Sequence, residues 1–267
     1  MHDLAFVFAG FAVGLIVGLT GVGGGSLMTP VLIFFFGIKP HLAIGTDLLF
    51  AAFTKLGGTV SMARQRLVPW RVVAQLCAGS VPAALLALWA LRVLGPASAQ
   101  AQHIMTTTLG FALLLTAAAT LYKVVAFSRE RQAADQARRA GSDTQATRPR
   151  HWSLPVLLGA VIGTLVTFTS VGAGAIGVTV LLLVYPLLPL PRIIGADIAY
   201  AVPLTLVAGL GHATLGSVDW PLLAQLLAGS LPGIWLGSRL VTRTPERVIR
   251  SALSLLLAWA GFKLILI

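Results

Sequence analysis

The sequence predicts an all-α polytopic membrane protein made of two inverted repeats, each with about five apolar segments. Composition is the first reason. The chain is 57% hydrophobic and only 10% charged, with a mean hydropathy of +0.91, whereas soluble domains carry about 25% charged residues. Internal repetition is the second reason, because motifs of the first half return in the second half.

Three motifs return at one constant offset of 150 positions (197 − 47, 220 − 70 and 232 − 82). They are Gly45-Thr46-Asp47 with Gly195-Ala196-Asp197, Val68-Pro69-Trp70 with Val218-Asp219-Trp220, and Gln75–Pro82 with Gln225–Pro232. Many carriers place their substrate site between two such repeats. The duplication therefore makes transport the first hypothesis.

Apolar runs divide each repeat into five predicted helical segments. In the first repeat they cover residues 4–20, 24–37, 41–63, 70–92 and 103–127, and in the second 153–170, 173–188, 192–214, 220–240 and 248–267. A bilayer-crossing helix needs about 20 apolar residues. The last three segments of each repeat meet this length, whereas glycine clusters shorten the first two. We predict eight to ten transmembrane segments, some of them short or re-entrant.

The placement of arginine predicts sidedness. The arginine-rich gaps at 64–71 and 241–247 and the linker at 128–152 should be cytoplasmic, because cytoplasmic loops are enriched in Lys and Arg. The gaps at 93–102 and 215–219 contain neither residue and should face outward. The gap after the third segment then lies on opposite sides in the two repeats, so the repeats are inverted and both termini are periplasmic.

The predicted domains are an N-terminal transmembrane repeat (1–127), a basic cytoplasmic linker (128–152) and a C-terminal transmembrane repeat (153–267). The formal net charge is +11, but the basic residues concentrate in loops and at helix ends. Their expected partners are anionic lipid headgroups rather than nucleic acid. The chain has one cysteine, and no Cys/His cluster has metal-ligand spacing. We expect no metal, no cofactor and no enzymatic activity, and leave a homodimer open.

Two acids, Asp47 and Asp197, lie inside apolar runs at matching positions of the repeats. A carboxylate at hydrocarbon depth is costly unless it is hydrated or paired. One interpretation is gating or proton coupling, and the other is helix capping, because each acid lies within two turns of its predicted helix start. His212, late in a predicted span, is a further candidate for proton coupling, with a hydrogen-bonded structural histidine as the alternative.

Lys55 also lies well inside a predicted span, and the second repeat has Thr205 in its place. An intramembrane lysine indicates a functional site, and an anion is its natural ligand. The alternatives are a partner for Asp47 or a side chain that reaches the membrane interface.

Two glycine clusters, Gly21–Ser26 and Ser170–Ala175, interrupt the apolar run between the first and second segments of each repeat. Glycine lets backbone amides approach a ligand, and a helix that begins just after it offers free N–H groups. Close helix packing or a simple turn is the alternative. The substrate-binding residues that we predict are Gly23, Gly24, Gly25, Ser26, Thr46, Lys55, Ser170, Gly172 and Gly174.

Three features resemble the TauE/SafE family of membrane permeases: Gly18–Pro30 (GLTGVGGGSLMTP), Gly45–Leu49 (GTDLL) and the repeated Ala-Gly-Ser-x-Pro. The resemblance extends over both repeats. It implies a carrier in the bacterial inner membrane that exports sulfite or related organosulfonate anions. We therefore predict a secondary transporter of a small anion, with an anion channel or a carrier of a small carboxylate as alternatives.

Overall fold

The structure is a computed structural model that describes residues 2–20, 27–139, 153–185, 188–240 and 246–265. These residues form ten α helices and no strand. The helices are α1 (His2–Thr20), α2 (Met28–Phe36), α3 (Pro40–Arg64), α4 (Trp70–Leu94), α5 (Ala99–Arg139), α6 (Ser153–Thr169), α7 (Ala175–Val184), α8 (Leu190–Thr214), α9 (Trp220–Leu240) and α10 (Glu246–Ile265). The all-α fold class and the five segments per repeat are confirmed.

The second helix of each repeat is short. Helices α2 and α7 contain 9 and 10 residues, which at 1.5 Å per residue gives about 14 and 15 Å. This is about half of the hydrocarbon thickness, which is about 30 Å. Neither helix can therefore cross a bilayer alone.

By length and composition alone, three helices in the described part of the chain could cross a membrane: α4, the stretch Ala99–Leu121 of α5, and α8. Helix α3 has the same length as α4, 25 residues, but carries Asp47 and Lys55 in its interior. Helix α5 continues to Arg139, so the predicted linker is helical over 128–139. Residues 140–152 lie outside the described ranges, and the domain boundary at 127 stays a prediction.

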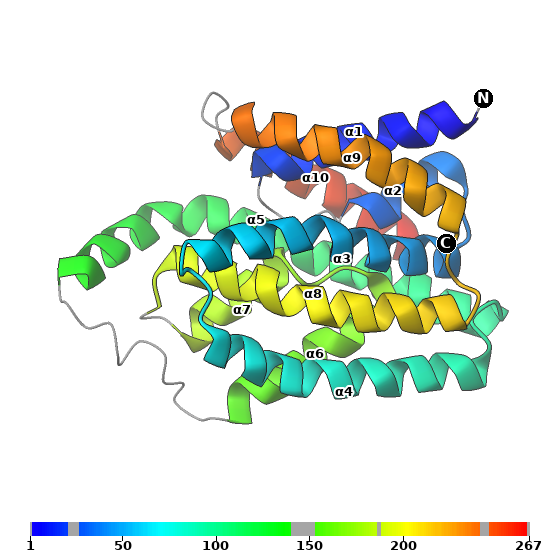
Figure 1. The fold of residues 1–267 in the computed structure, drawn as a ribbon, viewed down its shortest axis with the longest axis horizontal. Coiled ribbons are helices and arrows are strands. Elements are labelled where there is room, and N and C mark those ends of the chain that lie inside the picture. Colours follow the sequence, from blue (N-terminus) through cyan, green and yellow to red (C-terminus); the bar gives the residue numbers. More distant parts are fainter. Residues whose placement is uncertain (1, 21–26, 140–152, 186–187, 241–245, 266–267) are drawn as a thin grey trace.

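Helices of the first repeat pack in pairs with helices of the second repeat. Helix α1 packs along α9 and α6 along α4, whereas α3 packs on α8 and α5 on α10. Figure 1 shows α1 and α9 along one edge of the bundle and α4 and α6 toward the opposite edge, with α3 and α8 between them. Interchanging the repeats (α1 with α6, and so on to α5 with α10) leaves this pattern unchanged. A packing pattern with this symmetry is expected when a pseudo-two-fold axis relates the two repeats.

Close contacts of glycines show the relative chain direction of the helices in the two outer pairs, α1 with α9 and α6 with α4. Glycines 10, 14 and 18 of α1 lie against the backbone of α9 at Leu226, Ser230 and Ile234 in turn. Glycines 159 and 163 of α6 lie against α4 at Leu76 and Ser80. Both contact series advance in the same chain direction, so each outer pair is parallel. The small-residue spacing that allows this approach is typical of membrane helices.

The central pair, α3 and α8, is antiparallel. A Cβ atom at Gly45, near the start of α3, would meet the carbonyl oxygen of Ser217, just after α8 ends. A Cβ atom at Gly195, near the start of α8, would meet the carbonyl oxygen of Leu67, just after α3 ends. Two equivalent helices that run in opposite directions are the signature of an inverted repeat.

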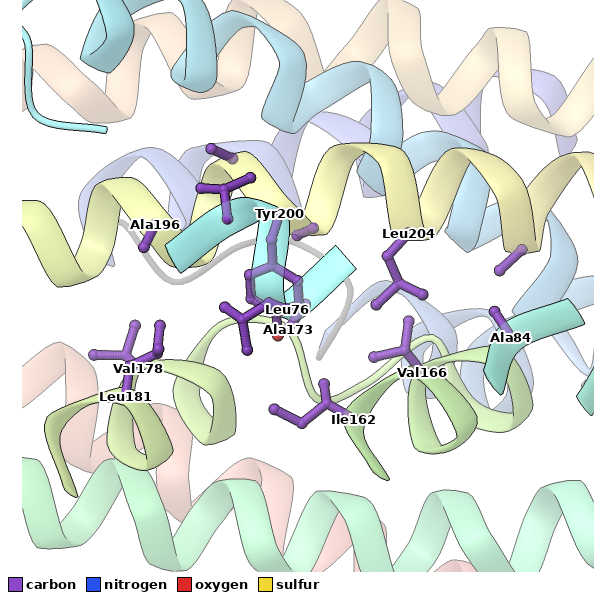
Figure 2. Packing of buried hydrophobic residues seen from close by; sticks show 14 of the residues in the cluster. Leu76, Ala84, Ile162, Val166, Ala173, Val178, Leu181, Ala196, Tyr200 and Leu204 are labelled. Carbon is purple, nitrogen blue, oxygen red and sulfur yellow. The ribbon is translucent and has the colours of Figure 1, made fainter. Parts of the chain in front are cut away.

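Apolar side chains from both repeats form the core around the segment that joins α6 to α7. Leu76 of α4, Ile162 of α6 and Tyr200 of α8 belong to one buried cluster. Figure 2 shows the Tyr200 ring extending from α8 toward Ala173 in that joining segment. The core therefore holds the joining segment against α8.

Candidate functional site

The chain between α6 and α7 leaves helical geometry at buried positions. Ser170 has φ 58°, Gly172 has φ 136° and Gly174 has φ 137°. These values lie in the left-handed region, which glycine adopts without steric strain and other residues adopt rarely. The glycines of the predicted cluster therefore make a sharp break between two helices.

Side chains from two other helices satisfy carbonyl groups near this break. The ammonium group of Lys55, on α3, donates a hydrogen bond to the carbonyl oxygen of Ala173 at 3.0 Å. Nε2 of His212, on α8, lies 3.0 Å from the carbonyl oxygen of Thr167. A carbonyl oxygen can only accept, so Nε2 carries the proton that it donates. Backbone groups freed within a membrane need such internal partners.

The carboxylate of Asp47 is fully buried, at 0% exposure. The hydroxyl group of Thr29, on α2, donates a hydrogen bond to its Oδ2 atom at 2.5 Å. The Ser170 side chain also interacts with this carboxylate. Within the described residues, Asp47 Oδ1 and Ser170 Oγ have no partner in hydrogen-bond geometry. Two buried polar atoms beside the break thus lie close to one another without a hydrogen bond of standard geometry.

The carboxylate of Asp197 lies against α7. A Cβ atom at Gly177 would sit 2.0 Å from Asp197 Oδ1 and 3.0 Å from the Tyr200 hydroxyl oxygen. Only a residue without a side chain leaves room for the carboxylate there. Tyr200 is buried and interacts electrostatically with Asp197, so α7 and α8 together seat this acid.

Lys55 links the two acids. Its charge interacts with Asp197 and, more weakly, with Asp47. We call the group formed by Asp47, Lys55, Ser170, Ala173 and Asp197 the central site. It lies between α3, α8 and the α6–α7 break, and both repeats contribute to it. Neither acid is the N-cap residue of its helix, because that position is taken by Lys39 in α3 and Pro189 in α8; the gating or proton-coupling role of the two acids stays a prediction.

Other predicted residues lie elsewhere. The Thr46 hydroxyl oxygen accepts a hydrogen bond from the backbone N–H of Asp219 at 3.0 Å, so Thr46 holds the start of α9. A Cβ atom at Gly172 would face Val166 and Leu165 on α6. The predicted binding residues Gly23, Gly24, Gly25 and Ser26 lie outside the described residues.

Sequence reasoning missed Thr29, Gly177 and Tyr200. Thr29 could have been found from the repeat, because Thr179 stands 150 positions later (179 − 29), just as Asp197 follows Asp47. Tyr200 had no such signal, because Phe50 stands at the matching position. Gly177 belonged to an apolar run and became visible only with the packing of α7 on α8.

Comparisons with known proteins agree with this architecture. The chain is 33% identical to YjnA of Bacillus subtilis (strain 168), a probable membrane transporter protein, over 272 residues that cover 98% of this chain and 100% of the relative. It is 27% identical to YdhB of the same organism, also a probable membrane transporter protein, with 96% and 97% covered. A probable membrane transporter protein of Xylella fastidiosa (strain 9a5c) is 27% identical, with 88% and 83% covered.

No solved structure matches the chain closely enough for comparison. The family model described as "Sulfite exporter TauE/SafE" matches residues 6–264, which is nearly the whole chain and includes the central site. Together with the inverted repeats and the apolar helices, this match identifies the chain as a multi-pass membrane transporter of the TauE/SafE family.

Proposed function

We propose that the protein is a proton-coupled secondary transporter of a small anion, either a sulfur oxyanion or an organosulfonate, and that the anion binds at the central site. The observation that carries the proposal is the burial of one ammonium group with two carboxylates at the point where α6 breaks from α7. Buried charges in a membrane protein mark substrate or proton pathways by default. The name of the family supports a sulfur oxyanion as the substrate.

The charges of the central site support proton coupling. One ammonium can neutralise one carboxylate, and Lys55 interacts more strongly with Asp197 than with Asp47. Asp47 is then the acid without a full counter-charge, and it is the group that we assign to take up a proton. Protonation of Asp47 would remove the negative charge that repels an incoming anion.

The break supplies the groups that an oxyanion needs. Helix α7 begins directly after Gly174, so its positive dipole end and its first N–H groups lie at the break, where the Gly177 N–H already donates to the Gly172 carbonyl oxygen. The Ser170 hydroxyl, without a hydrogen-bond partner in the described structure, adds a donor. Lys55 adds a positive charge. A sulfite or sulfonate group has three oxygen acceptors, which such a set of converging donors can bind.

The short helices α2 and α7 support alternating access around this site. Carriers with inverted repeats commonly bind substrate where discontinuous helices meet near the midplane. The orientation that we propose keeps both termini periplasmic and the linker at 128–152 cytoplasmic, with its basic residues near anionic headgroups.

A thermal-shift series tests the substrate proposal. The purified protein is melted with sulfite, sulfate, thiosulfate, sulfoacetate or a simple carboxylate, since a ligand that binds only the folded state raises the melting temperature. We expect one sulfur anion to stabilise the wild type and Lys55→Met to lose that response. Lys263→Met, which changes an exposed lysine on α10, should keep it. A response to none of the sulfur anions, or a stronger response to the carboxylate, would contradict the proposed substrate.

A further inference from the structure

Lys55 carries a charge and is nevertheless buried, with 6% exposure. Its ammonium group reaches from α3 across to the other repeat. There it donates to the Ala173 carbonyl oxygen and interacts with both carboxylates of the central site. Three groups with oxygen atoms that can bind cations, one carbonyl and two carboxylates, therefore interact with one side-chain nitrogen.

Carriers with broken helices bind Na⁺ through carbonyl oxygens of unwound backbone. Hard cations such as Na⁺ prefer oxygen ligands, and Ala173 lies within the unwound stretch after α6. In this protein the position beside Ala173 is filled by the protein's own ammonium group. The lysine thus provides the positive charge that a free ion would otherwise supply.

We propose that the Lys55 ammonium acts as a tethered cation, that transport therefore does not use Na⁺, and that removing the lysine opens a Na⁺ site formed by the Ala173 carbonyl and the carboxylates of Asp197 and Asp47. The statement about transport rests on the proposed function. The cation site itself is a property of the folded protein and needs no substrate.

The second repeat provides no substitute for this charge. Thr205 stands at the position that matches Lys55, and its hydroxyl donates to the Ala201 carbonyl oxygen of its own helix at 2.7 Å. Loss of the lysine would remove its positive charge from beside two buried carboxylates and would take away the donor of the Ala173 carbonyl oxygen. Removing one partner of a buried charge interaction is strongly destabilising, so binding of a small cation there would restore stability.

A purely structural role for Lys55 makes a different prediction. If the lysine only satisfies the Ala173 carbonyl, its removal destabilises the protein equally in every salt. If it stands in for a cation, its removal creates a preference for Na⁺ over larger cations. Selectivity among cations therefore separates the two roles, and loss of stability alone does not.

The experiment compares melting temperatures in NaCl, KCl and N-methyl-D-glucamine chloride at equal ionic strength. The variants are Lys55→Thr, which copies the second repeat, Lys55→Met, and the double variant Lys55→Thr with Asp197→Asn. We expect the wild type to melt at one temperature in all three salts. Both single variants should melt about 3 °C higher in NaCl when Na⁺ is about tenfold above its dissociation constant. The double variant should lose that difference.

Stabilisation of the wild type by Na⁺, or single variants that respond equally to all three salts, would overturn the proposal. The wild type also gives a test that needs no variant to fold. Its anion flux in liposomes should be the same under a Na⁺ gradient and a K⁺ gradient, and an increase specific to the Na⁺ gradient would refute the tethered cation. Failure of the anion thermal-shift series would instead count against the proposed substrate, so the two proposals fail separately.

Discussion

The hydroxyl group of Thr29, on the nine-residue helix α2, donates a hydrogen bond to Oδ2 of the fully buried Asp47 on α3. This contact ties the half-length helix to the acid that we assign to proton coupling. A hydrogen bond to a charged group contributes about 1.5–3 kcal/mol, more than one between neutral groups. Thr29 should therefore influence when Asp47 gains and loses its proton.

We predict that Thr29→Val slows proton-driven anion flux by about tenfold or more, the change in rate that corresponds to a loss of about 1.4 kcal/mol. Valine keeps the shape of threonine without the hydroxyl, and Thr29→Ser, which keeps the hydroxyl, should retain most of the flux. Thr116→Val is the matched control, because the Thr116 hydroxyl bonds only the Ala112 carbonyl of its own helix. Equal flux in Thr29→Val and Thr116→Val would remove Thr29 from the mechanism.

Alanine substitutions at Gly45 and Gly57, both on α3, should have opposite effects on the stability of the protein. A Cβ atom at Gly45 would lie 1.9 Å from the backbone oxygen of Ser217, whereas one at Gly57 would meet nothing within 4 Å. Gly45→Ala should separate α3 from the end of α8 and destabilise the protein by about 1–3 kcal/mol or more. Gly57→Ala should keep or raise the melting temperature, because alanine favours helix. Similar melting temperatures for the two variants would be evidence against the close α3–α8 contact.

Gly177→Ala should impair transport more than folding. The added methyl group would collide with Asp197 Oδ1 and crowd the Tyr200 hydroxyl, so the carboxylate must move away from α7. Gly58→Ala provides the control, because its Cβ atom would be 3.5 Å from Ile198 Cγ2, an ordinary contact. We expect anion flux in liposomes to fall at least about tenfold in Gly177→Ala and to stay near wild type in Gly58→Ala. A Gly177→Ala protein with normal flux would show that the seating of Asp197 is unimportant.

His212 should be required for stability through its bond to Thr167. Met62 stands at the matching position of the first repeat, and His212→Met would leave the Thr167 carbonyl oxygen buried without its donor, at a cost of about 1–3 kcal/mol. His212→Gln keeps a donor and should melt closer to the wild type. His103→Met, at an exposed position on α5, should have little effect. The order of the three melting temperatures checks this assignment.

Much of the fold was readable from the sequence because the same physical signal appears twice. Apolar length predicted the helices, and the arginine-rich gaps predicted opposite orientations of the repeats, which the antiparallel contact of Gly45 with Ser217 bears out. The extent of α2 and α7 could not be read, because glycine-rich runs are compatible with both a short crossing and a half-length helix. The helical continuation of α5 to Arg139 was also missed, because its polar composition is typical of a solvated linker.

Only some residues of the central site could be predicted from the sequence. Asp47, Asp197 and Lys55 could be selected because a charge in an apolar run is conspicuous. The partners of these residues could not be predicted from the sequence, since the Ala173 carbonyl is a backbone group and Gly177 contributes by lacking a side chain. Thr46 is the neighbour of Asp47 in sequence, but its hydroxyl oxygen accepts a hydrogen bond from Asp219 at the start of α9, and its role in substrate binding stays a prediction.

The most direct test of the central claim is the flux of labelled sulfite in liposomes with and without an imposed pH gradient. We predict that wild-type flux is saturable and that its rate changes with the gradient. Asp47→Asn should remove this dependence, whereas Asp219→Asn, which changes the acid that caps the start of α9, should keep it. Wild-type flux that ignores the pH gradient, or coupling in Asp47→Asn equal to that of the wild type, would contradict the account.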